Sequence, residues 1–103
     1  MMDPVEYFID QRGWFCENCG YPTDRYNRPE RHHCIIRRNK NRPEFDEEIN
    51  IELVCHRCHT SGIVDSFEHR QEFAMRQINR GYDVKSWVES LNLKYIEDWL
   101  LRL

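Results

Sequence analysis

Long apolar stretches, internal repeats and low-complexity tracts are all missing from this sequence. No run approaches the roughly 18–20 consecutive apolar residues that a membrane-spanning helix needs, and the mean hydropathy is −0.85. The first residues also lack the basic and then apolar order of a secretory signal peptide. We therefore expect a soluble, cytoplasmic protein that makes no contact with a membrane.

The chain is too short for two independent domains. It has 103 residues, of which 40% are hydrophobic and 32% are charged. A single core is marginal at this length, and additional cross-links or metal sites would help to stabilise it. We expect one domain over residues 1–103, with a core of about 14–62 and a helical extension of about 65–103.

The net charge of −3 conceals a strong local asymmetry. Residues 25–42 carry seven basic side chains and one acidic side chain, so the rest of the chain is strongly acidic. Because charges more than about 8–10 Å apart are largely screened at physiological salt, a local basic segment can still bind a polyanion. The alternative is a solvated basic loop that is balanced by the acidic residues at 44–52.

Five cysteines are present, and their spacing favours metal binding over disulfides. Cys16 and Cys19 form one C-x-x-C pair, and Cys55 and Cys58 form another. In a protein of the cell interior, two such pairs predict four thiolate ligands of a structural Zn²⁺. Cys34 lies alone between them and is predicted to be a small buried residue. The alternative is four buried cysteines with no metal.

The segment between the two pairs predicts a hairpin. Cys16 to Gly20 has the form of a zinc knuckle, and residues 31–37 have the β-branched centre of a strand. A turn-rich and then acidic stretch separates this strand from a second one at 51–54. Such a hairpin folds the chain back, so the two cysteine pairs can meet. The predicted class is α+β, a small zinc-stapled domain.

The last third of the sequence is helical in pattern. Asp65, three positions before Glu68, predicts a helix over about 66–79 that Gly81 ends. Its predicted buried face carries Phe67, Phe73, Ala74 and Ile78, and His69 is predicted to lie at the surface. A further helical segment starts near Asp83 and includes Trp87, Val88 and Leu91. A last one carries Ile96, Trp99, Leu100 and Leu103, which would close the core or contact a protein partner or a second copy.

Four more residues gather in the hairpin: the adjacent His32 and His33, then Asn50 before the second strand, and His59 directly after the last zinc cysteine. The order C-x-x-C-G, His-His, Asn-Ile, C-x-x-C-His resembles the HNH endonuclease family. Its ββα-metal motif is built on a treble-clef zinc scaffold. The resemblance covers residues 16–59, and the continuation 66–94 is similar to small bacteriophage-type HNH proteins.

The resemblance implies a function and a role for each residue. His32 and His59 would bind a catalytic divalent cation, His33 would act as the general base, and Asn50 would hold the loop and His33 in position. An imidazole has an unperturbed pKa near 6.5 and can accept a proton from water near neutral pH. The implied activity is hydrolysis of DNA phosphodiester bonds to 5′-phosphate and 3′-hydroxyl ends, in a bacterial or bacteriophage-infected cell.

The sequence departs from the fuller family pattern at Ile63, where some relatives add a third histidine. Two protein ligands with water and phosphate oxygens suit Mg²⁺ or Mn²⁺. Neighbouring strand residues point to opposite faces, so His32 and His33 are expected to share a site only across a bend or bulge. His56, inside the second cysteine pair, is predicted to face solvent.

Arg37 and Arg38 follow the paired histidines directly. Guanidinium groups bind phosphate in a bidentate manner, so these two residues are the predicted DNA contacts. They could instead pair with the acidic residues after Pro43.

The leading hypothesis is a metal-dependent HNH endonuclease. One alternative is a non-catalytic treble-clef zinc module that binds nucleic acid or protein, which would leave the histidines and Asn50 coincidental. A thiol redox protein is a second alternative, but the sequence lacks the βαβ context that such a protein needs.

Overall fold

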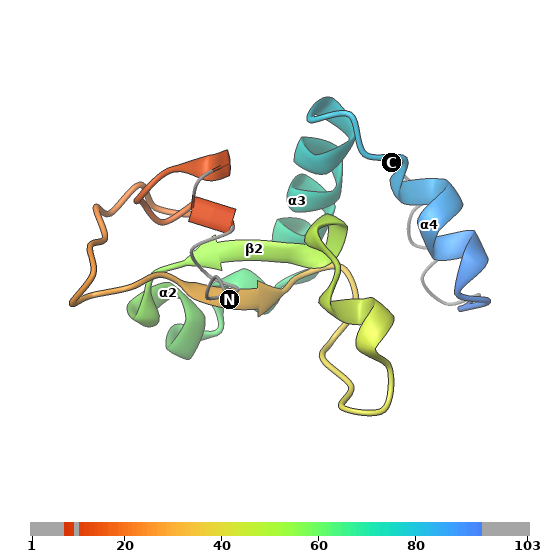
Figure 1. Cartoon of the computed structure of the whole chain (residues 1–103), viewed down its shortest axis with the longest axis horizontal. Coiled ribbons are helices and arrows are strands. Elements are labelled where there is room, and N and C mark those ends of the chain that lie inside the picture. Colours follow the sequence, from red (N-terminus) through yellow and green to blue (C-terminus); the bar gives the residue numbers. More distant parts are fainter. Residues whose placement is uncertain (1–7, 10, 94–103) are drawn as a thin grey trace.

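A computed structural model describes residues 8–9 and 11–93 of the chain. They form a small α+β unit around a two-stranded sheet, as expected. The strands and helices in this part are β1 (Glu30–His33), β2 (Ile51–Val54), α2 (His56–Ser61), α3 (Phe67–Asn79) and α4 (Val84–Ser90). Figure 1 shows α2 and α3 beside the hairpin, with α4 on the far side of α3.

The two strands pair in an antiparallel register that contains no bulge. His32 lies opposite Glu52, and His33 lies opposite Ile51. The first strand is shorter than the predicted 31–37, because it ends at His33. Beyond that point the side chain of Asn50 binds the backbone, so the chain turns away from the sheet.

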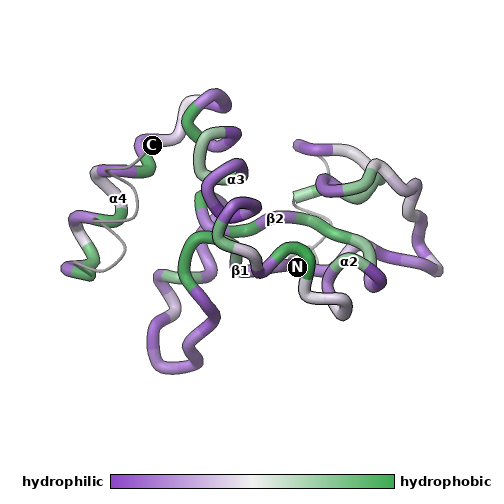
Figure 2. Tube along the Cα trace, turned by 180° about the vertical axis from the view of Figure 1, so that it is seen from behind, coloured by the Kyte–Doolittle hydropathy of each residue, from purple (hydrophilic) through white to green (hydrophobic). Residues whose placement is uncertain are grey.

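The connection between the strands contains two short 3₁₀ turns, Pro43–Asp46 and Glu48–Asn50. Pro43 starts the first turn, and Phe45 within it is buried. The stretch before these turns is strongly polar and projects from the body of the protein (Figure 2). This arrangement leaves the basic residues of the loop at the surface.

Every residue of β2 is buried, because both faces of the sheet are covered. Ile51 and Leu53 pack with Phe8 and Ile9 from the N-terminal segment. Val54 faces the other side, where it packs with the cysteines and with Val64. The strand is therefore the centre of the fold, and it also positions Glu52 inside the protein.

Helix α3 supplies most of the second half of the core. Phe73 and Ala74 are fully buried against a set of residues from the loop and from α4. That set is Cys34, Ile35, Ile36, Phe45, Ile49, Val84 and Val88. The prediction for Cys34 is confirmed. The prediction for Phe67 is wrong, since it is 44% exposed at the first residue of the helix.

The ends of the helices follow from short local signals. Ser66 caps α3 by accepting a hydrogen bond from the His69 amide, so the cap lies one residue after the predicted Asp65. Gly81, with φ 102°, lies just beyond the helix end, as predicted, and Gly62, with φ 80°, ends α2. These left-handed conformations favour glycine.

Helix α4 confirms the segment that was predicted from Asp83. Asp83 is its N-cap and accepts a hydrogen bond from the Ser86 amide. Val88 is buried, and Trp87 and Leu91 pack against the same core. The predicted segment with Ile96, Trp99, Leu100 and Leu103 lies outside the described residues. Across the described ranges, no helix is long and apolar enough to cross a membrane.

Candidate functional site

The four paired cysteines meet at one point, as their spacing predicts. The sulfur atoms of Cys16, Cys19, Cys55 and Cys58 all lie within 4.8 Å of one another. The Sγ atoms of Cys19 and Cys55 are 3.9 Å apart. A tetrahedral zinc site with bonds of about 2.3 Å has sulfurs about 3.8 Å apart. The donor set therefore fits a structural metal ion such as zinc, and none of the five cysteines forms a disulfide.

Local backbone structure presents each pair. In the first, the Gly20 amide donates to the Cys16 carbonyl at 2.8 Å, and Gly20 takes a left-handed φ of 78°. In the second, Cys55 is the N-cap of α2 and Cys58 lies in its first turn. A knuckle on one side and a helix start on the other thus converge on one centre.

Cys58 shows what a bound cation would change in this cluster. Burial raises its pKa to about 12, although the Asn18 side chain donates to its sulfur at 3.3 Å and opposes this. Cys16 and Cys55 are buried with it, and Cys19 is exposed. A bound cation is the group that would stabilise four thiolates at such a short separation.

A separate cavity of about 450 Å³, here called the histidine cavity, brings together three of the four predicted catalytic residues, and Asn50 is not in its lining. It is lined by Arg31, His32, His33, Arg37, Arg38, His59 and Asp65. His32 and His33 both line this cavity although their pairing with β2 contains no bulge. The strand ends at His33, and the chain bends at residues 35–36.

His32 is buried, and its Nε2 lies 2.9 Å from the carbonyl oxygen of Val64. A carbonyl can only accept, so Nε2 carries the proton and Nδ1 of the neutral ring keeps a lone pair. Burial lowers the pKa of His32, which favours this neutral form. The ring of His59 lies edge-on to it, with centroids 5.4 Å apart.

His59 is held in the same manner, by the carboxylate of Glu30. Its Nδ1 donates to Glu30 at 2.7 Å, and His56 donates to the other oxygen at the same distance. Partial burial raises the pKa of Glu30, but the hydrogen bonds from His59 and His56 outweigh it, so the pKa lies below its usual value. The other ring nitrogen of His59, Nε2, is then the one that can bind a cation.

His33 points toward the 3₁₀ turn, where its Nε2 lies 2.6 Å from a carboxylate oxygen of Asp46. The carboxylate accepts, so Nδ1 is the nitrogen that can accept a proton. Neither Asp46 nor Glu30 is marked by the sequence, because no fixed spacing links them to the histidines. The structure adds both to the site.

Asn50 is fully buried and binds the loop after β1 through four hydrogen bonds. Its carbonyl oxygen accepts from the amides of Ile35 and Ile36 at 2.9 and 2.8 Å. Its amide nitrogen donates to the carbonyls of Ile36 and Phe45, at 2.8 Å each. Asn50 therefore joins the end of β1 to the turn that carries Asp46.

Arg37 and Arg38 are exposed at the rim of this cavity. Among the described residues neither forms an ion pair with the acidic stretch, where Arg42 pairs with Glu44 instead. Asp65 also lines the cavity, 3.7 Å from the Nε2 of His32. Ile63, at the position of the missing third histidine, is exposed.

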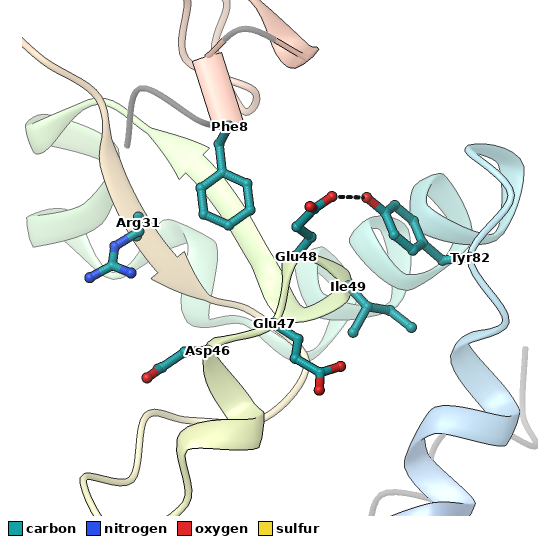
Figure 3. A pocket seen from close by; sticks show the side chains of 7 residues that line it. All are labelled: Phe8, Arg31, Asp46, Glu47, Glu48, Ile49 and Tyr82. Atoms are coloured by element: carbon teal, nitrogen blue, oxygen red, sulfur yellow. Dashed lines mark hydrogen bonds between the residues drawn. The ribbon is translucent and has the colours of Figure 1, made fainter. Parts of the chain in front are cut away.

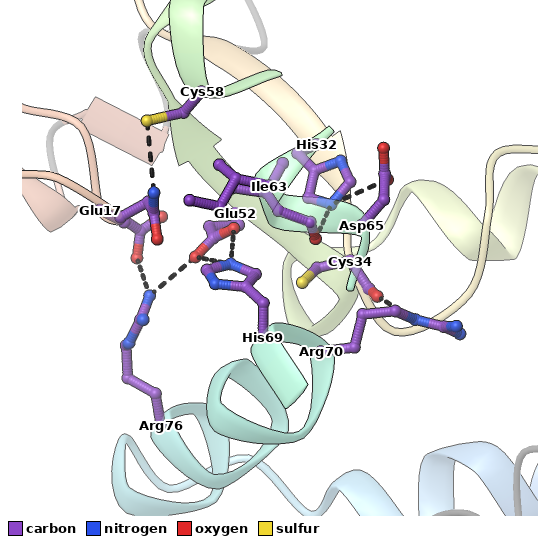
Figure 4. Close-up of polar contacts among 12 residues, drawn as sticks. Glu17, His32, Cys34, Glu52, Cys58, Ile63, Asp65, His69, Arg70 and Arg76 are labelled. Atoms are coloured by element: carbon purple, nitrogen blue, oxygen red, sulfur yellow. Dashed lines mark hydrogen bonds and ion pairs between the residues drawn. The ribbon is translucent and has the colours of Figure 1, made fainter. Parts of the chain in front are cut away.

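The prediction for His69 is wrong. This residue is buried, and its Nε2 lies 2.7 Å from the carboxylate of Glu52 (Figure 4). Arg76 donates to the same carboxylate at 3.0 Å and lies 3.7 Å from Glu17 in the zinc knuckle. The sequence pattern of β2 did not identify this network. Glu52 alternates with apolar residues, which is typical of a strand with one exposed face, but α3 covers the face on which Glu52 lies.

Another cluster of possible metal ligands lies in the interior. His32, Cys34 and Glu52 bring ligating atoms within 4.8 Å of one another. Glu52 is already paired with His69, however, and burial raises the pKa of the Cys34 thiol well above its usual value. Cys34 and Glu52 therefore belong to the packed interior, and His32 lies between them and the histidine cavity.

A larger cavity, of about 610 Å³, adjoins the histidine cavity and shares Arg31 with it (Figure 3). It is lined by Phe8, Arg31, Asp46, Glu47, Glu48, Ile49 and Tyr82. Its walls carry three carboxylates but no histidine or cysteine, so it lacks the imidazoles that the histidine cavity brings together. Tyr82 donates to Glu48 across it at 2.6 Å.

Comparisons of the chain with models of protein families, with curated proteins and with solved structures found no match.

Proposed function

We propose that this protein is a metal-dependent DNA endonuclease that uses an HNH-type mechanism. The observation that carries the proposal is the state of three histidines in one cavity. Each of His32, His33 and His59 has one ring nitrogen engaged by an oxygen acceptor, which leaves the other nitrogen available. The resemblance of residues 16–59 to the HNH pattern supports the same assignment.

The roles divide between two ligands and a base. His32 and His59 would hold a divalent cation, and Glu30 orients His59, as carboxylates commonly do for metal-bound histidine. A cation there would supply positive charge for the scissile phosphate and for the leaving oxygen. With two histidine ligands, and water and phosphate oxygens completing the shell, Mg²⁺ and Mn²⁺ are the suitable ions.

His33 takes a proton from the attacking water at Nδ1. Asp46 accepts the hydrogen bond from Nε2, fixes the ring and stabilises the imidazolium that forms. The hydroxide oxygen bonds to phosphorus as the bond from phosphorus to the 3′ oxygen breaks, and the departing 3′ oxygen takes a proton from solvent water. The products then carry 5′-phosphate and 3′-hydroxyl ends, and His33 returns its proton to solvent. Asn50 is a positioning residue, because it joins the end of β1 to the turn with Asp46.

DNA is the proposed substrate because three arginines line the same cavity as the histidines. Arg31, Arg37 and Arg38 place guanidinium groups where a phosphate backbone would approach. The acidic pI of about 5.9 does not oppose this, since the surrounding loop is locally basic.

The cysteine cluster supports a treble-clef scaffold that a structural Zn²⁺ would stabilise. One C-x-x-C pair lies on a knuckle before the hairpin and the other at the helix start that follows it. A metal bound by both pairs would join the chain before β1 to the chain after β2. Thiolate ligands of zinc are typical of a reducing compartment. The resemblance to small bacteriophage-type HNH proteins suggests the cytoplasm of a bacterium or of a bacteriophage-infected host.

The test is cleavage of supercoiled plasmid by the zinc-loaded protein with Mg²⁺, with Mn²⁺ and without either ion. Wild-type protein should relax or linearise the plasmid only with a divalent ion. His33→Ala should lose activity by about 10²–10⁴-fold, the usual contribution of a general base. Its zinc content and melting temperature should stay close to those of wild type, which separates lost chemistry from lost fold.

Asp46→Asn is the companion variant. It keeps the size of the side chain and weakens only the partner of His33, so its loss of activity should be smaller than that of His33→Ala. Absence of any divalent-dependent cleavage by folded wild-type protein would overturn the proposal. A non-catalytic zinc module that binds nucleic acid or protein would then be the better description.

A further inference from the structure

A third cavity lies beside the cysteine cluster, outside the proposed catalytic residues. It encloses about 360 Å³, within the range of roughly 300–1,000 Å³ that small-molecule sites occupy. It is lined by Cys19, Tyr21, Asn27, Cys55, His56 and Arg57. None of these residues has a part in the hydrolysis described above.

The side chains of this cavity offer a ligand three different kinds of contact. Tyr21 is 55% exposed, although a tyrosine ring gains by being covered. The Asn27 side chain makes no hydrogen bond within the described part of the chain, and Arg57 is exposed on α2. An aromatic face, an amide and a guanidinium match the stacking surface, the polar edge and the phosphate of a nucleotide.

The loop that carries these groups is held in shape before any ligand binds. Asp24 accepts hydrogen bonds from the backbone amides of Tyr26 and Asn27, at 2.7 Å each. The Tyr21 carbonyl accepts from the amide of Cys16, at 2.8 Å, which ties it to the zinc knuckle. Tyr21 and Asn27 therefore face the cavity from a frame that needs little reorganisation.

Glu30 connects this cavity to the histidine cavity. One of its oxygens binds His59, which lines the histidine cavity, and the other binds His56, which lines this one. His56 and His59 are three positions apart on α2, where side chains are neighbours at about 5–6 Å. The two cavities therefore adjoin along one side of α2, and a single DNA strand could contact both.

We propose that this third cavity, the Tyr21 cavity, binds an unpaired nucleobase of a DNA strand. A phosphate of the same strand, close to that base, lies in the histidine cavity. Tyr21 stacks on the base, Asn27 pairs with its polar edge, and Arg57 contacts the adjoining phosphate. The proposal rests on the proposed function for its substrate. It assigns a preference for unpaired or extruded bases, which phosphate contacts alone would not produce.

The experiment measures binding without cleavage. Zinc-loaded His33→Ala protein, with no added Mg²⁺ or Mn²⁺, is titrated with two fluorescent probes of equal length. One is a short oligothymidylate, and the other is an abasic deoxyribose-phosphate oligomer. Tyr21→Ala, introduced into His33→Ala, should bind the oligothymidylate about tenfold more weakly and bind the abasic probe unchanged, since stacking on one base is lost.

Tyr26→Ala, also in the His33→Ala background, is the matched control. Tyr26 is 100% exposed in the same loop but does not line the cavity. It should leave both affinities unchanged. Tyr21→Phe keeps the aromatic ring, so its affinity for oligothymidylate should be close to that of the His33→Ala parent. If Tyr21→Ala loses its zinc, Tyr21→Phe and Asn27→Ala replace it in the test. Asn27→Ala should then weaken binding of the oligothymidylate and leave binding of the abasic probe unchanged.

Equal weakening of both probes by Tyr21→Ala, or no weakening of either, would overturn the inference. So would an equal loss in Tyr26→Ala, which would indicate a diffuse aromatic surface. Absence of oligothymidylate binding by the parent protein would also overturn it. Plasmid cleavage by wild type is measured separately, so failure of the base site and failure of the nuclease proposal give different results.

Discussion

His69 and Glu52 form a buried acid–base pair between α3 and β2, with 2.7 Å between the imidazole and the carboxylate. Glu52 is fully buried, and so Arg76 is needed as a second partner on the same carboxylate. Removing His69 leaves this buried carboxylate with Arg76 as its remaining partner, so the cost should lie at the lower end of that for breaking a buried pair.

His69→Ala should therefore lower the free energy of unfolding by about 3 kcal/mol, as measured by chemical denaturation. His56→Ala is the control, because His56 also pairs with a glutamate but its side chain is 71% exposed. Its cost should stay within about 1 kcal/mol. Similar losses in both variants would show that the buried pair contributes no more than a surface pair does.

Zinc content should depend on four of the five cysteines. Cys55→Ser should reduce bound zinc from about one per chain and lower the melting temperature sharply, because the binding energy of a structural metal contributes directly to folding. Cys34→Ala is the control, since Cys34 is buried outside the cluster. It should keep its zinc. Full zinc retention by Cys55→Ser would contradict the cluster assignment.

Substitutions of the three histidines should reduce cleavage for two different reasons, loss of a metal ligand or loss of the general base. His59→Ala and His32→Ala should weaken binding of Mn²⁺ in calorimetry, and excess Mn²⁺ should restore part of their activity. His33→Ala should bind Mn²⁺ normally and should not be rescued, because it removes a base and not a ligand. The reverse pattern, with Mn²⁺ binding lost only in His33→Ala, would exchange the roles.

Arg37→Ala combined with Arg38→Ala should weaken DNA binding similarly for unrelated sequences. The slope of log affinity against log salt should flatten by about one unit for each phosphate that an arginine no longer neutralises. Arg25→Ala combined with Lys85→Ala removes the same charge from exposed positions outside the cavity and should leave the slope nearly unchanged. An equal effect of the two pairs would show that only net charge matters.

Tyr82 predicts a dependence of stability on alkaline pH. Partial burial, and then the hydrogen bond to Glu48, raise the pKa of this phenol above its usual value. The folded state therefore retains the proton longer than the unfolded state. The stabilisation is complete below the unfolded pKa of about 10 and is lost as the pH rises through the folded pKa.

Tyr82→Phe removes the titrating group. Below about pH 9 it should be less stable by at most about 1 kcal/mol, because the lost hydrogen bond is partly exposed to water. The difference from wild type should shrink as the pH rises above 10. Parallel curves for the two proteins across this range of pH would exclude the assigned role of Tyr82.

Much of the fold could be predicted because its signals are local. The C-x-x-C spacing brings four sulfurs together, and the caps and the glycine around α3 place its ends within one or two residues. Asn50 was singled out by residue type and by its position before β2. Its four hydrogen bonds to the backbone depend on the loop conformation, which no sequence pattern describes.

The remaining features depend on contacts between distant segments. Glu30 and Asp46 acquire their histidine partners only when the hairpin has formed. Glu52 alternates with apolar residues in β2, and its burial follows from α3, which lies later in the chain. The prediction that His69 lies at the surface was wrong for the same reason. Charged residues surround it in the sequence, and they gave no indication that this face of α3 meets Glu52.

The contacts of Glu17 predict which parts of the protein unfold together. This knuckle residue accepts from the Leu53 amide of β2 at 2.5 Å and pairs with Arg76 and Arg80 at the end of α3. Metal knuckle, central strand and longest helix therefore belong to one cooperative unit, and they should open together. Amide hydrogens in the middle of α3 should lose their protection from exchange when a chelator removes the metal, although no ligand lies on that helix.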